Sequence, residues 1–494
     1  MSALRPMSRS RSLQLGAVGT GLAGLVVAGL PVSPATSAVP PDACPSAVPV
    51  TEVANGMTVD GLTVTSGSTP EAFTGEVLGV LGDGIAPGLD MIMVRLEGAQ
   101  ITDAGGAVDR GVWAGMSGSP VYAEDGRLLG AVAYGLSFAP SDVAGVTPAA
   151  AMLELSQDPG STAAKRAAAG ARRVEIPARV GASSGLTRAQ ASGGFRRLPM
   201  PFSVSGLSGA RLAKVVDRFD IRRRLVTGSA AAAEAAPPAI VPGGNLVASL
   251  SYGDITYAGT GTATAVCGGE VLGFGHPLLW AGRSTYSMHN AEAIYIQRDN
   301  VFGSFKVANP TAPLGGIFQD RLAGIVGVND EFPDVTDVTS HVTSTIGGSR
   351  DGQTSITTRG AIPFLSAIHL VANADRVLDK VGAGSAEVSV TVAGTRADAS
   401  AWQYTRSNSF ASGRDIAYES AFEPYRHLSA ILGNQFERVN ITDVDYEATY
   451  APAYRALSLT GLEARVKGAW VTVGNRRSVP VLAGSELALR ATLT

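Results

Sequence analysis

The sequence has little charge, few aromatic residues and almost no cysteine. Charged residues make up 16% of its 494 residues and aromatic residues 6%, against 45% hydrophobic residues. This composition excludes a coiled coil, a collagen-like chain and wholesale disorder. Two cysteines in a chain of this length exclude a small disulfide-stapled scaffold. The formal net charge of −3 gives no sign of a nucleic-acid partner.

Several functional motifs are also missing from the sequence. It contains no H-E-x-x-H, no paired C-x-x-C, no Walker A loop and no dinucleotide fingerprint. Metalloprotease, NTPase and dehydrogenase functions therefore have no support, and no metal or other cofactor is expected.

Glycine and proline are abundant, with 60 and 27 copies. They separate short apolar runs, which is the pattern of strands joined by tight turns, so we expect a mainly β protein of about two to four domains. The composition changes along the chain predict these parts: a signal peptide (1–38), a β half-barrel (39–160), a basic connecting segment with a linker (161–245), a second β half (246–348) and a β-rich C-terminal domain (349–494).

The N-terminus has the pattern of an export signal. Three arginines precede an apolar stretch at residues 13–32, and the small residues at 36–38 suit a signal peptidase. We expect a secreted or cell-envelope protein; a retained membrane anchor is the alternative. Cys44 and Cys267 both follow the cleavage point and can pair in an oxidising compartment.

A basic segment interrupts an otherwise acidic chain. Residues 165–224 hold 14 basic and 3 acidic side chains, a net charge of +11. Such a segment contacts either an anionic partner in the cell envelope or the acidic body of its own protein. The alanine- and proline-rich stretch at residues 228–244 has the composition of an exposed linker. If the protein cleaves itself, we expect the cleavage there or near the signal junction.

The most informative string is GVWAGMSGSPVYAEDGRLLGAVAYG at residues 111–135. Glycines flank a serine in a turn, and a proline, two strands and an Asp-Gly turn follow. This pattern places the Ser117 hydroxyl at the mouth of a hairpin, a suitable position for a nucleophile. Ser119 is the alternative nucleophile. The flanking glycines let the amides of Gly115 and Ser117 stabilise a developing oxyanion.

A serine nucleophile needs a base, and the chain has only five histidines. His276 ends a strand at a Gly-His-Pro corner, which leaves its imidazole free to project. His289 is the second candidate. The remaining three are expected on the surface or in packing positions: His341, His369 and His427.

These two motifs resemble those of a known family. The string at residues 111–135 is similar to the nucleophile motif of the SpoIVB-type serine peptidases, and GTGTATAVCGGEVLGFGHPL at residues 259–278 is similar to their histidine motif. The resemblance spans residues 76–323. It implies a chymotrypsin-like double β-barrel, with Ser117 as nucleophile and His276 as general base. It also implies an acid shortly before the serine: Asp103 is our choice, with Asp109, Asp90 and Asp254 as alternatives.

The order of the two motifs differs from that of the family. The histidine motif comes first in the sporulation peptidases, whereas His276 here follows Ser117 by 159 residues. Catalytic triads work in any chain order, so we expect a rearranged barrel. No PDZ-like domain is recognisable. The expected function is a secreted serine endopeptidase acting on a protein or peptide substrate, or on itself; the alternative is a non-catalytic cell-envelope binding protein on the same scaffold.

Overall fold

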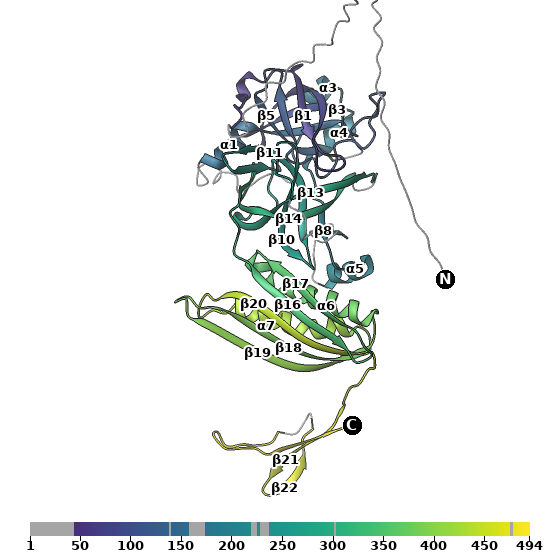
Figure 1. Ribbon diagram of the computed structural model, residues 1–494, viewed down its shortest axis with the longest axis vertical. Coiled ribbons are helices and arrows are strands. Elements are labelled where there is room, and N and C mark those ends of the chain that lie inside the picture. The colour runs from purple at the N-terminus through teal and green to yellow at the C-terminus, as the bar shows by residue number, and fades with distance from the viewer. Residues whose placement is uncertain are drawn as a thin grey trace, which may run out of the picture. The chain divides into compact units, whose positions relative to one another are not determined.

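A computed structural model describes residues 44–137, 140–157, 173–218, 225–227, 237–300, 303–474 and 478–494 (Figure 1). Strands dominate these ranges, which confirms the mainly β prediction. The expected signal peptide, residues 1–38, lies outside the described residues.

The first sheet closes into a barrel of six antiparallel strands. Neighbouring strands pair in the order β4-β1-β2-β3-β6-β5, and β4 also pairs with β5. The predicted Asp125-Gly126 turn joins β4 to β5, with Gly126 at φ +81°. The barrel strands are β1 (Thr58–Thr63), β2 (Glu71–Ala86), β3 (Leu89–Gly98), β4 (Pro120–Ala123), β5 (Leu128–Leu136) and β6 (Val143–Pro148).

Inward side chains fill this barrel. Val59, Phe73, Ile92 and Val121 are buried together, and the loop between β3 and β4 adds Trp113 to the same core. This explains the apolar residues of the 111–135 string, because the loop is anchored in the barrel interior. A short 3-10 helix, η1 (Val50–Glu52), precedes the barrel.

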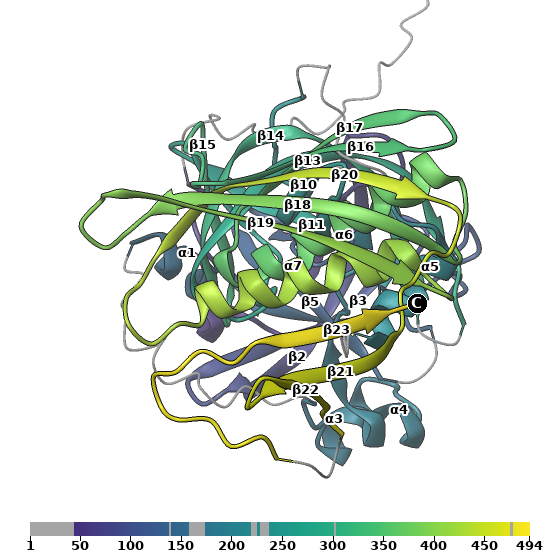
Figure 2. The same cartoon turned by 90° about the horizontal axis from the view of Figure 1, so that it is seen from below.

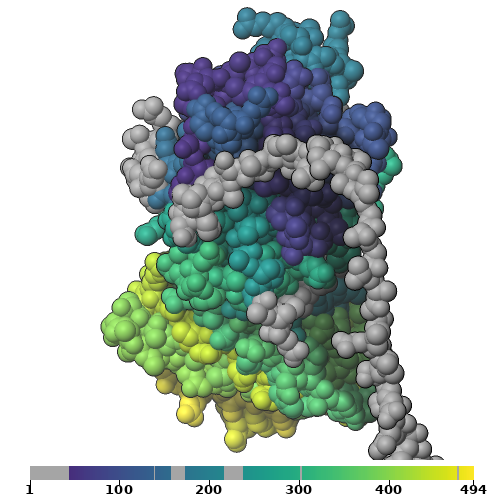
Figure 3. Space-filling view, turned by 45° about the horizontal axis from the view of Figure 1, so that its top comes forward, coloured from purple at the N-terminus to yellow at the C-terminus, as the bar shows by residue number. Residues whose placement is uncertain are grey.

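The strand pairings of the second sheet also return to their starting point. They run β10-β13-β14-β15-β12-β11, and β10 pairs with β11 as well as β13. We refer to these six strands as the second circuit: β10 (Asn245–Gly253), β11 (Tyr257–Cys267), β12 (Glu270–Gly273), β13 (Gly282–Gln297), β14 (Phe305–Arg321) and β15 (Gly324–Asn329). In Figure 3 its teal surface adjoins the purple and blue surface of the barrel.

The described parts of the basic segment contribute to both sheets. β7 pairs with β5, and β8 pairs with β11. The guanidinium of Arg211 is buried and pairs with Asp375 and Asp415. This contact agrees with docking on the protein's own acidic body. The elements are α1 (Ala149–Gln157), α3 (Ala178–Ser183), α4 (Arg188–Gly193), β7 (Phe195–Arg197), β8 (Phe202–Val204), α5 (Gly209–Arg218) and β9 (Leu225–Thr227). Most of the expected linker, residues 228–236, lies outside the described ranges.

The second sheet continues beyond the circuit through β17, which pairs with β10. The β16–β17 hairpin crosses the domain boundary expected at residues 348/349, so β16 belongs with the C-terminal strands. Two helices, α6 and α7, pack on one face of these strands (Figure 2). The elements are β16 (Thr336–Ser344), β17 (Ser349–Ile356), η2 (Arg359–Ala361), α6 (Ile362–Leu378), β18 (Gly384–Thr395), β19 (Ala401–Ser412), α7 (Ile416–Leu432) and β20 (Asn440–Ala451).

The helix at residues 359–378 is the one described segment long and apolar enough to cross a membrane. Its side chains are mostly buried against the sheet and α7, as in a core helix of a folded domain. The chain ends in a separate small sheet of β21 (Leu459–Val466), β22 (Ala469–Thr472) and β23 (Leu489–Leu493).

Candidate active site

The serine turn lies between β3 and β4, just before the first residue of β4. Gly115 and Gly118 have φ values of +106° and +99°, which side-chain-bearing residues rarely adopt. A Cβ on Gly118 would also lie 1.9 Å from the carbonyl oxygen of Thr262. Glycine is therefore required at position 118 by both conformation and space.

Strand β11 of the second circuit holds this turn in place. The Thr262 amide donates to the Ser117 carbonyl at 2.8 Å, and its hydroxyl donates to the Gly115 carbonyl at 2.9 Å. The Thr264 hydroxyl donates to the Gly118 carbonyl at 2.8 Å. The alternating threonines of β11 thus fix the position of Ser117 from the other sheet.

His276 follows β12 in the second circuit. The chain turns through positive φ values at Phe274 (+68°) and Gly275 (+65°), so the strand stops just before the histidine. The Thr147 hydroxyl of the barrel donates to the Gly275 carbonyl at 2.6 Å. Each sheet therefore holds the turn that carries the other sheet's candidate residue.

The two predicted residues meet between the sheets. Ser117 Oγ lies 2.8 Å from His276 Nε2, although 159 residues separate them in the sequence. His276 Nδ1 lies 2.9 Å from the carbonyl oxygen of Pro277. Because a carbonyl oxygen only accepts, Nδ1 carries the proton and Nε2 accepts from the serine hydroxyl. This is the tautomer that a general base needs.

The pair is closed off from solvent. Ser117 is 0% exposed and His276 is 1% exposed. Burial lowers the pKa of His276 to about 3; the hydrogen bond to Pro277 opposes this shift, and the positive charge of Arg197 adds to it. His276 is consequently neutral at physiological pH.

Asp103 does not orient His276, so that prediction is wrong. Its side chain is exposed, and Oδ1 accepts the amides of Gly105 and Ala107 within its own turn. The Asp-Ala-Gly-Gly sequence places a carboxylate in a local turn, where it binds main-chain donors.

The three alternative acids are also engaged elsewhere. Asp109 pairs with Arg110, and Asp254 pairs with Arg350 at 2.8 Å. Asp90 accepts the Asp83 amide at 2.8 Å. The imidazole is therefore oriented by a main-chain carbonyl, and no carboxylate of the described residues contacts the Ser-His pair.

A buried acid does act on the histidine turn, and the sequence analysis missed it. Asp320 in β14 is 0% exposed and accepts the amides of Leu278 and Leu279 at 2.8 Å each and that of Ala281 at 3.2 Å. The Tyr286 hydroxyl donates to it at 2.9 Å. Asp320 thus fixes the loop directly after Pro277, whose carbonyl holds His276.

The amides of Gly115 and Ser117 are the expected oxyanion donors. Within the described ranges, the amides of Gly115 and Ser117 donate to no main-chain carbonyl, whereas the Gly118 amide donates to Val132 at 2.8 Å. Buried amides are normally paired, so two unpaired ones beside a serine hydroxyl are consistent with an oxyanion site.

Lys306 packs against the same turn and was not predicted. Its amide donates to the Ala114 carbonyl at 2.8 Å, and a Cβ on Gly115 would lie 2.7 Å from Lys306 Cβ. Its Nζ donates to Asn245 Oδ1 at 2.7 Å and lies 5.2 Å from the centre of the Trp113 ring. Burial lowers the pKa of Lys306 to about 7.

The second-choice residues have other partners. The Ser119 hydroxyl donates to Thr63 at 3.0 Å. His289 Nε2 lies 2.7 Å from Ser249 Oγ, and its Nδ1 lies 2.9 Å from the Thr311 carbonyl. This second buried Ser-His pair lies on paired strands, with Ser249 and His289 in the ladders of β10 and β13, and lacks the glycine-flanked turn.

The other three histidines occupy either packing positions or surface positions. His369 is buried between the hydroxyls of Thr354 and Ser340, at 2.9 Å each. His341 is exposed and pairs with Asp351 at 2.6 Å. Buried histidines bonded to hydroxyls therefore recur in this protein, and the turn around Ser117 is what distinguishes the candidate site.

Cys44 and Cys267 are joined in a disulfide. Cys267 ends β11, the strand whose threonines hold the serine turn. The bond therefore ties the start of the described chain to the second circuit.

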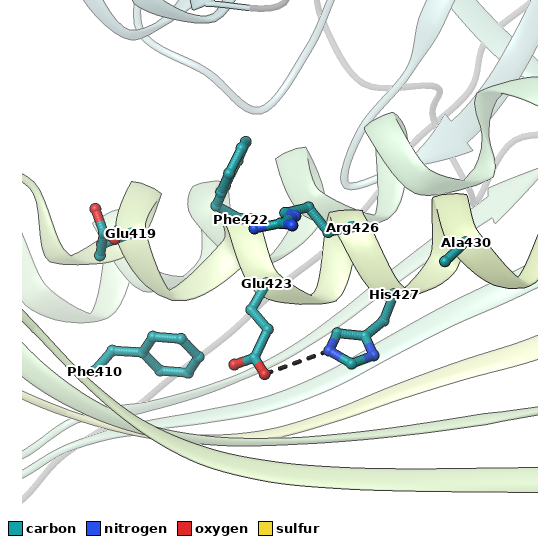
Figure 4. Close-up of a pocket in the computed structure, with 7 residues that line it drawn as sticks. All are labelled: Phe410, Glu419, Phe422, Glu423, Arg426, His427 and Ala430. Atoms are coloured by element: carbon teal, nitrogen blue, oxygen red, sulfur yellow. Dashed lines mark ion pairs between the residues drawn. The ribbon is translucent and has the colours of Figure 1, made fainter. Parts of the chain in front are cut away.

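A hollow of about 520 Å³ lies far from Ser117 in sequence, between α7 and β19 (Figure 4). Glu423 points toward His427 there, at 3.4 Å, and also accepts from Arg406 and Asn408 at 3.1 and 2.6 Å. This carboxylate is held by three partners, and the described residues that line the hollow include no serine or cysteine, so the hollow is not a candidate active site.

In the part of the chain that the structure describes, no group of three or more histidine, cysteine or acidic residues is arranged to hold a metal ion. No family model, curated protein or solved structure matches the chain.

Proposed function

We propose that the protein is a serine peptidase in which Ser117 attacks a peptide carbonyl and His276 is the general base. The observation that carries this proposal is the 2.8 Å contact between Ser117 Oγ and His276 Nε2, with Nδ1 held by the Pro277 carbonyl. The glycine-flanked turn and its two unpaired amides support it.

In the proposed reaction, His276 Nε2 takes the hydroxyl proton as Ser117 Oγ bonds to the carbonyl carbon. The carbonyl electrons move to oxygen, and the amides of Gly115 and Ser117 stabilise the charge. The C–N bond then breaks as Nε2 returns the proton to the leaving amine. Water, deprotonated by the same nitrogen, releases the acyl group and restores the hydroxyl.

We infer that the barrel and the second circuit form a double barrel of the chymotrypsin-like type. Support comes from the closed pairing order of each sheet and from the position of the Ser-His pair between them. The family resemblance, to the SpoIVB-type serine peptidases, is likewise a proposal. It accommodates the serine-first order because the geometry of the pair does not depend on which sheet comes first.

The proposed enzyme is in a closed form. With Ser117 and His276 buried, a peptide reaches the hydroxyl only after the atoms that cover it move. Opening would also hydrate His276 and raise its pKa toward its ordinary value, which makes it a stronger base. Activity is thus expected to depend on an opening step.

A non-catalytic binding protein is the second candidate, and the same burial favours it. A histidine with a pKa of about 3 is a poor base as it stands, and the Ser249–His289 pair shows that this chain also uses such contacts in packing.

Export is part of the proposal. The Cys44–Cys267 disulfide supports an oxidising compartment, since such bonds persist mainly outside the cytosol. The cell-envelope contact and self-cleavage within residues 228–244 remain proposals.

Cleavage of a mixed peptide library by the purified protein, read by mass spectrometry, tests the substrate class. We expect new termini with wild type and none with Ser117→Ala. Hydrolysis of p-nitrophenyl esters without any peptide cleavage would indicate an esterase and contradict the peptidase proposal.

A further inference from the structure

A cavity of about 360 Å³ is lined in part by the loop that leads to Ser117. Ala114, three residues before Ser117, forms part of its lining, and Leu198 forms another part. The Leu198 amide donates to the Ala133 carbonyl at 3.0 Å, and a Cβ on Gly275 would lie 3.0 Å from Ala133 Cβ. The cavity therefore borders the segment that leads into the serine turn, whereas Ser117 and His276 themselves do not line it. Its volume suits one or two amino-acid side chains.

The lining is strongly basic. Arg110, Arg196 and Arg197 all line the cavity. Arg110 is neutralised by Asp109, but Arg196 and Arg197 make no ion pair with any described residue. One acid, Asp299, also lines the cavity, and it is already engaged in another interaction.

Arg196 and Arg197 are exposed at this cavity and have no ion-pair partner among the described residues. Each therefore offers a site for a carboxylate, because guanidinium groups bind carboxylates through paired hydrogen bonds. Strand β7 fixes their backbone by pairing Arg197 with Tyr134 and Arg196 with Gly135. The charge of Arg197 also reaches the site, since it contributes to the lowered pKa of His276 after the larger effect of burial.

We propose that Arg196 and Arg197 bind a carboxylate of the peptide substrate, so that the site selects acidic peptides. This inference rests on the proposed function for its substrate, but the binding itself requires no catalysis. The carboxylate comes from an acidic side chain or from the C-terminus of the peptide, and the two sources can be tested separately.

The test measures binding of fluorescein-labelled, alanine-rich octapeptides to full-length Ser117→Ala protein by fluorescence anisotropy. Two C-terminally amidated peptides differ only in one central residue, glutamate or glutamine. A third has the glutamine and a free C-terminal carboxylate. We expect at least one carboxylate peptide to bind about tenfold more tightly than the amidated glutamine peptide, and to weaken in 0.5 M salt.

The double variant Arg196→Gln/Arg197→Gln, built in the same background, should abolish that preference. Arg188→Gln is the matched control, because Arg188 is an exposed arginine of the same basic segment outside the cavity lining. Its preference should equal that of the parent.

Equal affinity for all three peptides, or no binding at millimolar concentration, would overturn the inference. A preference retained by the double variant would do the same. The proposed function fails separately, through an unreactive Ser117, and that result would leave a measured carboxylate preference standing.

Discussion

Asp320 positions His276 without touching it. The carboxylate binds the amides of the two residues after Pro277, and the Pro277 carbonyl in turn accepts the Nδ1 proton of His276. In a catalytic triad, one carboxylate contacts the histidine and orients it. Here a main-chain carbonyl contacts the histidine, and a buried acid holds the loop that follows this carbonyl.

Asp320→Asn is expected to loosen this loop. An amide offers one acceptor oxygen where the carboxylate has two, so buried amides lose partners, at a cost of about 1–3 kcal/mol in the free energy of unfolding. The reaction of Ser117 with a fluorophosphonate should slow at least about tenfold. Asp103→Asn is the control, since Asp103 is exposed and its carboxylate binds amides of its own turn. Equal rates for both variants would contradict this role of Asp320.

Gly118→Ala should severely destabilise the protein. The new Cβ would lie 1.9 Å from Thr262 O and 2.5 Å from Phe274 N, at φ +99°. We expect a loss of about 3 kcal/mol or more in urea unfolding. Gly126→Ala is the matched control: φ is +81°, but no atom lies within 4 Å, so the cost should be about 1 kcal/mol. Similar losses for both would show that the turn is not packed against β11.

Lowering the pH should destabilise the fold at pH values well above those at which the carboxylates titrate. Burial lowers the pKa of His276 to about 3 and the pKa values of His289 and His369 to about 4. The unfolded chain, with ordinary histidine pKa values near 6.5, binds more protons below that pH. The free energy of unfolding should therefore fall as pH drops from 6.5 toward 4. Urea midpoints that do not change between pH 7 and pH 5 would contradict the neutral, buried histidines.

The disulfide should contribute measurably to stability. It joins residues 223 positions apart, so it removes much of the freedom of the unfolded chain. Reductant should lower the free energy of unfolding by about 2–5 kcal/mol. The double variant Cys44→Ser/Cys267→Ser should be equally destabilised and should not respond to reductant. A wild type that is indifferent to reductant would argue against a structural role for the bond.

Local sequence patterns were enough to select Ser117 and His276, which the structure places in contact. Each lies in a glycine-rich turn at the edge of a strand, and such turns are recognisable from residue type alone. A local pattern also argued against Asp103, because the glycines that follow it indicate a self-contained turn. The prediction followed the family resemblance instead.

Asp320 could not be found in this way. Its role depends on β14 running beside the loop after His276, and no local pattern gives that register. The long strands β13 and β14 and the helix α6 were missed for a related reason: their apolar residues pack against segments distant in the sequence. The closed barrel likewise depends on the pairing of β4 with both β1 and β5.

Fluorophosphonate labelling of the purified protein tests the central proposal most directly. Wild type should form an adduct that peptide mapping places on Ser117, at a rate that levels off with probe concentration because opening limits it. Ser117→Ala and His276→Ala should abolish labelling, whereas Ser249→Ala, which alters the other buried Ser-His pair, should retain it. Folded wild type that forms no adduct, or forms one on another residue, would contradict the peptidase proposal and favour the binding protein.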